Sequence, residues 1–255
     1  MRRGIRWRGA VVPVAILALV EIAAATTDLA GGGVAPPSKI GLAAFDALLD
    51  GSLLAASAQT LFAAISGVLI GSAIGLVLGV MLGLSRFAYW VAEVTLECFR
   101  PIPSVALIPV VLLIFGLGYW MEISLVAKSA LWPVFFFSVA SVRGIRARLI
   151  EVSRLLEMNP FERMWKIVIP AALPGIFVGF RLSLGIALIV AVTVEVAANP
   201  LGLGNAMMRA QETVRPYLML AYLLWIGLVG WALNSGILWL QERLFGRGAR
   251  PAAQA

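Results

Sequence analysis

The sequence predicts an all-α membrane protein with six transmembrane helices and a basic helix–turn–helix between the fourth and fifth. Of its 255 residues, 61% are hydrophobic and only 13% are charged, and the mean hydropathy is +0.97. Soluble domains carry about 25% charged residues, so this composition indicates one polytopic membrane domain. The longest polar interruption, residues 143–170, is strongly basic.

Apolar runs place the expected spans, which cover residues 10–25, 56–84, 90–115, 123–142, 171–198 and 218–240. Residues 1–37 are interpreted as an N-terminal signal-anchor span with its outer link, and residues 38–255 as the transmembrane domain. A cleaved signal peptide is the alternative for the first run, because small residues around 23–27 resemble a cleavage site. Short outer helices are expected over 38–49 and 205–217.

The distribution of basic residues predicts the orientation. Fourteen Lys or Arg side chains fall in segments assigned to the inner side, against about three in the outer links. Inner loops of membrane proteins are enriched in Lys and Arg, so both termini and residues 143–170 are expected in the cytoplasm. The net charge of +7 is thereby explained by contact with membrane lipid, and no nucleic-acid partner is expected.

The second span carries a glycine at every fourth position, which places these glycines close to one face of a helix. Small residues on one face let another helix backbone approach closely in lipid. A tight helix–helix seam is therefore expected, formed by Gly67, Gly71, Gly75, Gly79 and Gly83.

The third span combines charges with prolines. Glu97 and Arg100 are three residues apart and can pair on one helix face. Pro101 and Pro103 must break or kink the helix, which a membrane tolerates where the backbone lines a cavity or is covered by protein. These residues are candidates for a translocation path, with a salt bridge near the inner headgroups as the alternative. Lys128, in the fourth span, is expected to extend toward the outer surface.

Arg181 and Glu195 lie in the fifth span. Their separation along a straight helix is about 21 Å, too far for a direct pair. Each therefore needs a different partner, water or a solute, and both are further candidates for the path. Neutralisation of Arg181 by carboxylates or headgroups is the alternative.

Residues 143–170 predict two short helices. Apolar side chains at helical spacing indicate a first helix over 146–158. Asn159 has the pattern of an N-cap, with Pro160 at the first helical position and Glu162 three residues after the cap. The second helix is expected over 160–169, with Pro170 and Pro174 closing it before the fifth span.

The same segment resembles the cytoplasmic "EAA" signature of binding-protein-dependent ABC importer permeases. Glu151, Ile167, Ile169 and Pro170 fall on its Glu, Ile, Leu and Pro without a gap. Three flanking runs are similar to the nitrate/sulfonate/taurine/bicarbonate branch: RPIPSVALIPVVLLIFGLG (100–118), LPGIFVGFRLSLG (173–185) and NPLGLG (199–204). The similarity covers about residues 38–245. It implies a type I ABC importer permease fold.

The match has departures. Val152 and Ser153 stand where the signature has two alanines, and Glu157 stands where it has a glycine. Glycine permits a positive φ at this turn. Either Asn159 and Pro160 make the turn instead and Glu157 is a solvated helix residue, or Glu157 alters the docking surface for the ATPase.

The resemblance implies a permease that imports a small anion or zwitterion: nitrate, a sulfonate such as taurine, bicarbonate or an aromatic acid. It implies a bacterial inner membrane and three kinds of partner: ABC ATPase subunits that bind ATP and Mg, a second identical or non-identical permease, and a periplasmic or lipid-anchored binding protein. The residues implied in ATPase coupling are Glu151, Glu157, Asn159, Pro160, Phe161, Glu162, Arg163, Ile167 and Pro170.

Enzymatic activity is not expected. The sequence contains no G-x-x-x-x-G-K-[ST] motif, no histidine and one cysteine, so it offers no phosphate-binding loop, His-based triad or usual metal cluster. No cofactor is therefore expected in this chain. A self-contained secondary carrier is the alternative function, although such carriers often contain repeats and none is clear here. A membrane scaffold would not need a charged, proline-broken third span.

Overall fold

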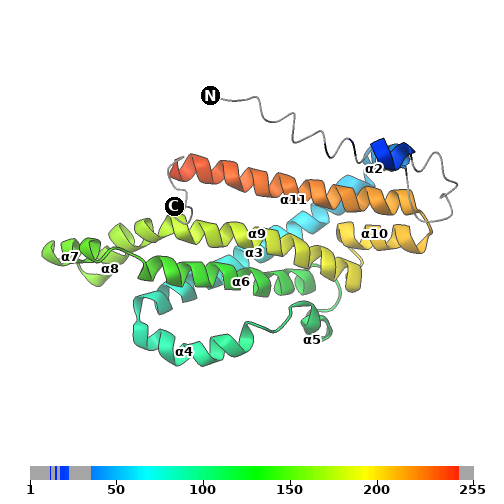
Figure 1. The fold of residues 1–255 in the computed structure, drawn as a ribbon. Helices are drawn as coiled ribbons and strands as arrows, with labels where there is room; N and C mark the ends of the chain where they lie inside the picture. Colours follow the sequence, from blue (N-terminus) through cyan, green and yellow to red (C-terminus); the bar gives the residue numbers. More distant parts are fainter. Residues whose placement is uncertain (1–11, 13–14, 16–17, 23–35, 247–255) are drawn as a thin grey trace, which may run out of the picture.

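The computed structural model describes residues 36–246 and, before them, residues 12, 15 and 18–22. Within these residues the secondary structure is helical (Figure 1). Four helical stretches are long and apolar enough to cross a membrane. They are α3 (Ser52–Leu84), α6 (Tyr119–Arg143), the stretch Pro160–Glu212 that contains α9 (Ile169–Ala197), and α11 (Pro216–Phe245). The expected first span, residues 10–25, lies largely outside the described residues.

The expected third span is divided into pieces. Helix α4 (Arg86–Phe99) ends before the two prolines, and a short 3-10 turn, η2 (Val105–Leu107), leads into α5 (Ile108–Phe115). Pro101 and Pro103 lack the backbone N–H that would continue the helix, so the predicted break is confirmed. Neither piece alone reaches the length of the four long helices.

Helix α6 lies between α3 and α9. The five glycines of the ladder are all buried on the side of α3 that contacts α6. A Cβ atom at Gly75 would lie 2.5 Å from the Leu131 carbonyl oxygen, and one at Gly79 would lie 2.7 Å from that of Phe135. The two backbones are thus as close as glycine allows. On the other side of α6, Gly179 of α9 approaches the Pro133 carbonyl in the same way.

One end of the molecule is formed by residues 143–170, which extend beyond the long helices in Figure 1. The first helix of this segment is α7 (Ala147–Leu155), and the second begins with α8 (Pro160–Arg163). The helix expected to stop before Pro170 instead continues through a π-helical turn, η3 (Met164–Val168), into α9.

The π turn explains why Pro170 does not end the helix. The Ile169 N–H donates to the Met164 carbonyl, five residues back, which widens the helix just before the proline ring. Pro170 follows directly after this widened turn, as the second residue of α9, so the continuous helix accommodates it at the π turn. The prediction that Pro170 and Pro174 close a separate helix is therefore wrong, and Pro174 lies inside α9.

The opposite end is formed by α2 (Pro37–Leu49), α10 (Gly202–Glu212) and the start of α11. Buried apolar side chains join these helices to α3: Ala47, Leu53, Leu203, Ala210 and Tyr222. The Trp225 indole N–H also donates to Ser57 Oγ at 2.8 Å, across α11 and α3. The second short helix expected over 205–217 is α10, which begins three residues earlier and ends at Glu212.

Candidate functional site

The predicted capping box of residues 143–170 is present. The Glu162 N–H donates to Asn159 Oδ1 at 2.8 Å, and the Asn159 N–H donates back to Glu162 Oε2 at 3.3 Å. Lys166 Nζ lies 3.2 Å from Glu162 Oε1 one turn later. Arg163 Nη2 donates to the Met158 carbonyl at 3.4 Å, so α8 is tied to the turn before it.

Glu157 makes the turn between α7 and α8. Its φ is +49°, the left-handed conformation that glycine adopts most easily, and the Met158 N–H donates to the Ser153 carbonyl at 3.1 Å. Together these form a Schellman helix end, with Glu157 in the position usually taken by glycine. Glu157 is therefore not a helix residue, and the expectation that Asn159 and Pro160 replace the glycine turn is wrong.

Apolar side chains are exposed around this turn. Leu155 is 83% exposed and Phe161 is 67% exposed, and the Phe161 ring lies 6.2 Å from that of Trp165. We call Leu155, Leu156, Phe161 and Trp165 the tip patch. Glu151, Glu157 and Pro170 are also exposed, whereas Ile167 is half-buried and the neighbouring Val168 packs against Val142 and Ala172. The base of the segment is thus fixed to the helix bundle while its apolar tip is uncovered.

The break in the third span is braced by α6. Lys128 Nζ donates to the Ile102 carbonyl between the two prolines, and Ser104 Oγ lies 2.5 Å from Ser129 Oγ. Lys128 therefore does not extend to the surface as expected. It binds a carbonyl that the broken helix has released, and such carbonyls need a partner in a membrane.

Arg100 and Glu97 do not form the expected pair. The Arg100 guanidinium lies over the Phe136 ring, 4.6 Å from its centroid, and the side chain of Glu97 is exposed. Among the described residues the one salt bridge joins Lys166 and Glu162. Arg100 thus contacts α6 through an aromatic face, a favourable cation–π arrangement.

A buried polar cluster lies at the end of the bundle opposite residues 143–170. We call Glu122, Glu195 and Asn199 the acidic cluster; each is at most 1% exposed. Asn199 Nδ2 donates to Glu122 Oε2 at 2.6 Å, and the Gly204 N–H donates to Glu195 Oε2 at 2.7 Å. This gives Glu195 the separate partner that its distance from Arg181 required.

The same end holds two more backbone contacts. The Gly202 N–H donates to Gln59 Oε1 and the Leu203 N–H to Thr60 Oγ1, each at 2.9 Å. The first turn of α10 is therefore bound by side chains of α3 and α9. Sequence reasoning missed Glu122, which falls between the expected third and fourth spans; the signal was a carboxylate directly beside an apolar run.

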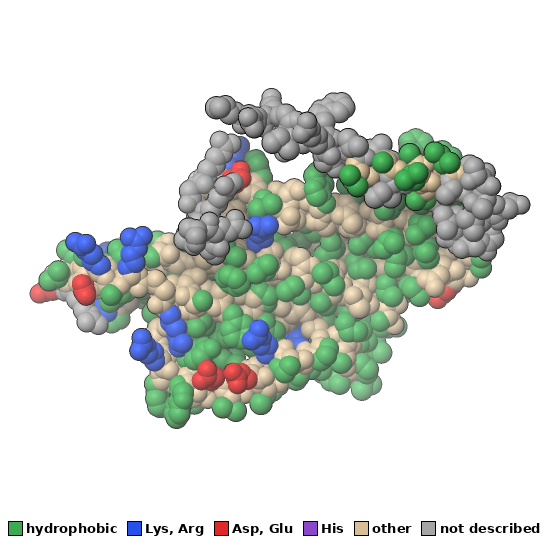
Figure 2. Space-filling model, in the orientation of Figure 1, with side chains coloured by type: hydrophobic (Ala, Val, Ile, Leu, Met, Phe, Trp, Pro, Cys, Tyr) green, Lys and Arg blue, Asp and Glu red, His purple; other side chains and the backbone are tan. Residues whose placement is uncertain are grey.

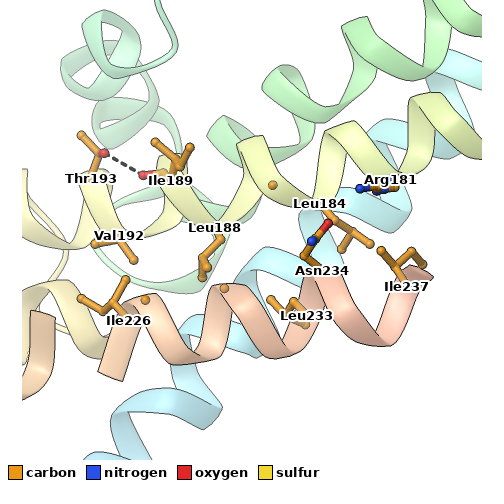
Figure 3. Close-up of a pocket in the computed structure, with 13 residues that line it drawn as sticks. Arg181, Leu184, Leu188, Ile189, Val192, Thr193, Ile226, Leu233, Asn234 and Ile237 are labelled. Atoms are coloured by element: carbon orange, nitrogen blue, oxygen red, sulfur yellow. Dashed lines mark hydrogen bonds between the residues drawn. The ribbon is translucent and has the colours of Figure 1, made fainter. Parts of the chain in front are cut away.

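Arg181 lies in a different place, a pocket of about 430 Å³ between α9 and α11. Asn234 of α11 lines the same pocket, and both side chains lie toward the same end of it in Figure 3. The remaining lining is apolar apart from Thr193, whose hydroxyl donates to the Ile189 carbonyl at 2.6 Å. Of the predicted path residues, Arg181 lines this pocket.

Comparison with known proteins supports the resemblance seen in the sequence. A family model described as "binding-protein-dependent transport system inner membrane component" matches residues 71–247. An aliphatic sulfonate transport permease, SsuC of Bacillus subtilis, is 29% identical over 93% of this chain and 86% of its own length. An ABC transporter permease of Methanocaldococcus jannaschii is 32% identical over 76% of this chain and 73% of its own. Taurine, nitrate and bicarbonate transport permeases are also similar.

Solved structures support the fold. A chain of the inward-facing MetNI methionine ABC transporter superimposes with a TM-score of 0.65 at 21% identity, covering 75% of this chain and 95% of that one. Together with the family match over most of the sequence, this identifies the chain as an integral inner-membrane protein of the binding-protein-dependent transport system family, the permease component of ABC importers.

Proposed function

We propose that this permease imports a small anionic or zwitterionic solute of the sulfonate, taurine, nitrate, bicarbonate or aromatic-acid kind, driven by a separate ATPase and supplied by a binding protein. The substrates named for its sequence relatives support this class. In the proposed topology, residues 10–25 and the broken helix α4–α5 complete six spans with the four long helices, and both termini are cytoplasmic.

The observation that carries the proposal is the uncovered tip patch on residues 143–170. Large apolar side chains exposed together mark contact sites, and the tip patch stands on a segment whose base is packed against α6 and α9. The ATPase, with ATP and Mg bound, docks here around α8. Movement of the ATPase is then transmitted to α9 directly, because η3 makes α8 and α9 one continuous helix.

A second permease, identical or not, completes the pore. Helix α11 supports this, because only 11% of its most apolar stretch is buried in the single chain, which leaves most of that stretch free to contact another subunit or lipid.

The binding protein docks at the opposite end on α2, α10 and the turn at Asp50. Hydrogen bonds from the hydroxyl and N–H of Ser52 hold the pKa of Asp50 below its usual range, so Asp50 itself keeps a negative charge on this surface.

The test is nucleotide-driven uptake in vesicles that contain the permease and its ATPase. Replacing both Phe161 and Trp165 with alanine should abolish the stimulation of ATP hydrolysis while the protein remains inserted. The control is Leu113→Ala on α5, an equally apolar side chain that is 88% exposed away from the tip patch. Full stimulation by the double variant would refute the docking site, and uptake without any ATPase would indicate a secondary carrier.

A further inference from the structure

The pocket between α9 and α11 contains a cation without a partner. Within the described residues, neither the Arg181 guanidinium nor the Asn234 amide makes a hydrogen bond, ion pair or ring contact. A charged side chain in a membrane span is costly unless something neutralises it. Asn234 can add an N–H donor beside the guanidinium, so this end of the pocket is suited to bind an anionic group.

The depth of the two residues argues against the membrane surface as the source of that anion. Arg181 lies twelve residues after the start of α9 and Asn234 lies eleven residues before the end of α11. The helices extend past the apolar runs, so depth is counted from the inner limits of those runs, residues 171 and 240. At 1.5 Å per residue Arg181 is then about 15 Å deep and Asn234 about 9 Å deep, within a hydrocarbon core about 30 Å thick. A lipid headgroup would have to leave the interface to reach them.

The rest of the pocket is apolar and extends along α9 from Leu184 to Val192, about 12 Å. Two glycines leave room on its walls: a Cβ atom built at Gly185 or Gly227 would meet nothing within 4 Å. Because Thr193 uses its hydroxyl on its own helix, all free polar groups are at the Arg181 end. The pocket thus has one polar end and a long apolar body.

We propose that this pocket is a transport subsite for an organic anion with one charged head and an apolar tail, such as an alkyl or aryl sulfonate. Arg181 and Asn234 bind the head and determine specificity, while the leucine and isoleucine walls bind the tail. Nitrate and bicarbonate fill only the polar end. This inference rests on the proposed function, because it uses the lining of the pocket to identify the chemical class of the solute that the importer carries.

The test is equilibrium binding of radiolabelled hexanesulfonate to the purified chain in phosphatidylcholine nanodiscs, with unlabelled competitors. Affinity should rise from methanesulfonate through propanesulfonate to hexanesulfonate, by about three- to fourfold for each methylene. Nitrate and bicarbonate, which have no tail, should compete about 250- to 1,000-fold less well than hexanesulfonate, as methanesulfonate should. Equal competition by all these anions would overturn the proposal.

Variants separate the head from the tail. Arg181→Gln should weaken hexanesulfonate binding about ten- to a hundredfold, and Arg181→Lys should weaken it less. Gly227→Leu should fill the tail region and remove the dependence on chain length. Its matched control is Gly236→Leu on the same helix, where a Cβ atom also meets nothing within 4 Å but which does not line this pocket. Unchanged binding by Arg181→Gln, or equal effects of the two glycine variants, would contradict the assignment.

Two further measurements are needed. One tests whether the anion in the pocket is a lipid, and the other separates failure of the pocket assignment from failure of the proposed importer function. Phosphatidylglycerol added to the nanodiscs should not reduce hexanesulfonate binding; competition by this anionic lipid would make the pocket a lipid site. Uptake is measured in parallel with the ATPase present. If nucleotide-driven uptake of a solute proceeds while hexanesulfonate fails to bind, the pocket assignment alone is wrong. If hexanesulfonate binds but solute uptake is the same with and without ATP, the proposed importer function is wrong.

Discussion

Glu157 adopts a backbone conformation that a side chain makes costly. Its positive φ at the end of α7 costs about 1 kcal/mol relative to glycine, because the Cβ atom crowds the following carbonyl. Glu157→Gly should therefore stabilise α7 by about that amount and slow hydrogen–deuterium exchange of the amides of 147–155. The matched control is Glu151→Gly inside α7, which should speed exchange by removing a helix-favouring residue. Faster exchange in Glu157→Gly would show that the side chain stabilises the turn.

The stability of the acidic cluster depends on the hydrogen-bond acceptors that its side chains provide. Glu122 Oε1, Glu195 Oε1 and Asn199 Oδ1 are buried without a hydrogen-bond donor in the described structure, while the other oxygen of each carboxyl accepts one hydrogen bond. Glu195→Gln keeps an acceptor for the Gly204 N–H and should be tolerated. Glu195→Ala strands that N–H and should lower the free energy of unfolding by about 1–3 kcal/mol.

Thermal unfolding in detergent measures the difference. Glu212→Ala is the control, because Glu212 is exposed at the end of α10 and should not change the unfolding temperature. If Glu195→Ala unfolds at the same temperature as the unmodified protein, the cluster does not hold α10 against α9.

At the scale of the helices, the close contact between α3 and α6 requires glycines, which have a hydrogen atom in place of a side chain. A methyl group at Gly75 would meet the Leu131 carbonyl oxygen at 2.5 Å and the Phe135 nitrogen at 3.1 Å, both on the backbone of α6. Gly75→Ala should therefore destabilise the protein by about 1–3 kcal/mol, because the two helices must separate. Gly236→Ala on α11, where the same methyl group meets nothing within 4 Å, should be neutral or stabilising. Equal melting temperatures for the two variants would contradict a close α3–α6 contact.

Local patterns predicted some elements and failed at others. The long apolar runs place α3, α6 and α11 within a few residues of their ends, and the capping box at Asn159 depends on neighbouring residues alone. The path through Pro170 could not be predicted, because a π turn overrides the rule that proline ends a helix. The hydrogen bond between Glu122 and Asn199 could not be predicted from local patterns, because the two residues are far apart in the chain. The contact of Lys128 with the Ile102 carbonyl could not be predicted either, because it depends on how the broken third span packs against α6.

At the scale of the whole molecule, the charges define two different ends. Lys and Arg side chains gather toward the α7–α8 end in Figure 2. In the described residues that end carries Arg86, Arg143, Arg146, Arg148, Arg163, Lys166 and Arg243, against Lys39, Arg209 and Arg215 at the α2–α10 end. The asymmetry favours the α7–α8 end as the cytoplasmic one.

Single cysteines test this orientation directly, because Cys98 is the one cysteine of the sequence and Cys98→Ser gives a background without thiols. In that background, Leu155→Cys places a thiol on the tip patch and Thr213→Cys places one after α10, both at exposed positions. A membrane-impermeant maleimide should label Thr213→Cys in cells whose outer membrane has been opened, and Leu155→Cys only after the inner membrane is opened as well. The reverse pattern would put the tip patch outside the cell, where no ATPase could bind it, and would remove the physical basis for coupling through α8 and α9.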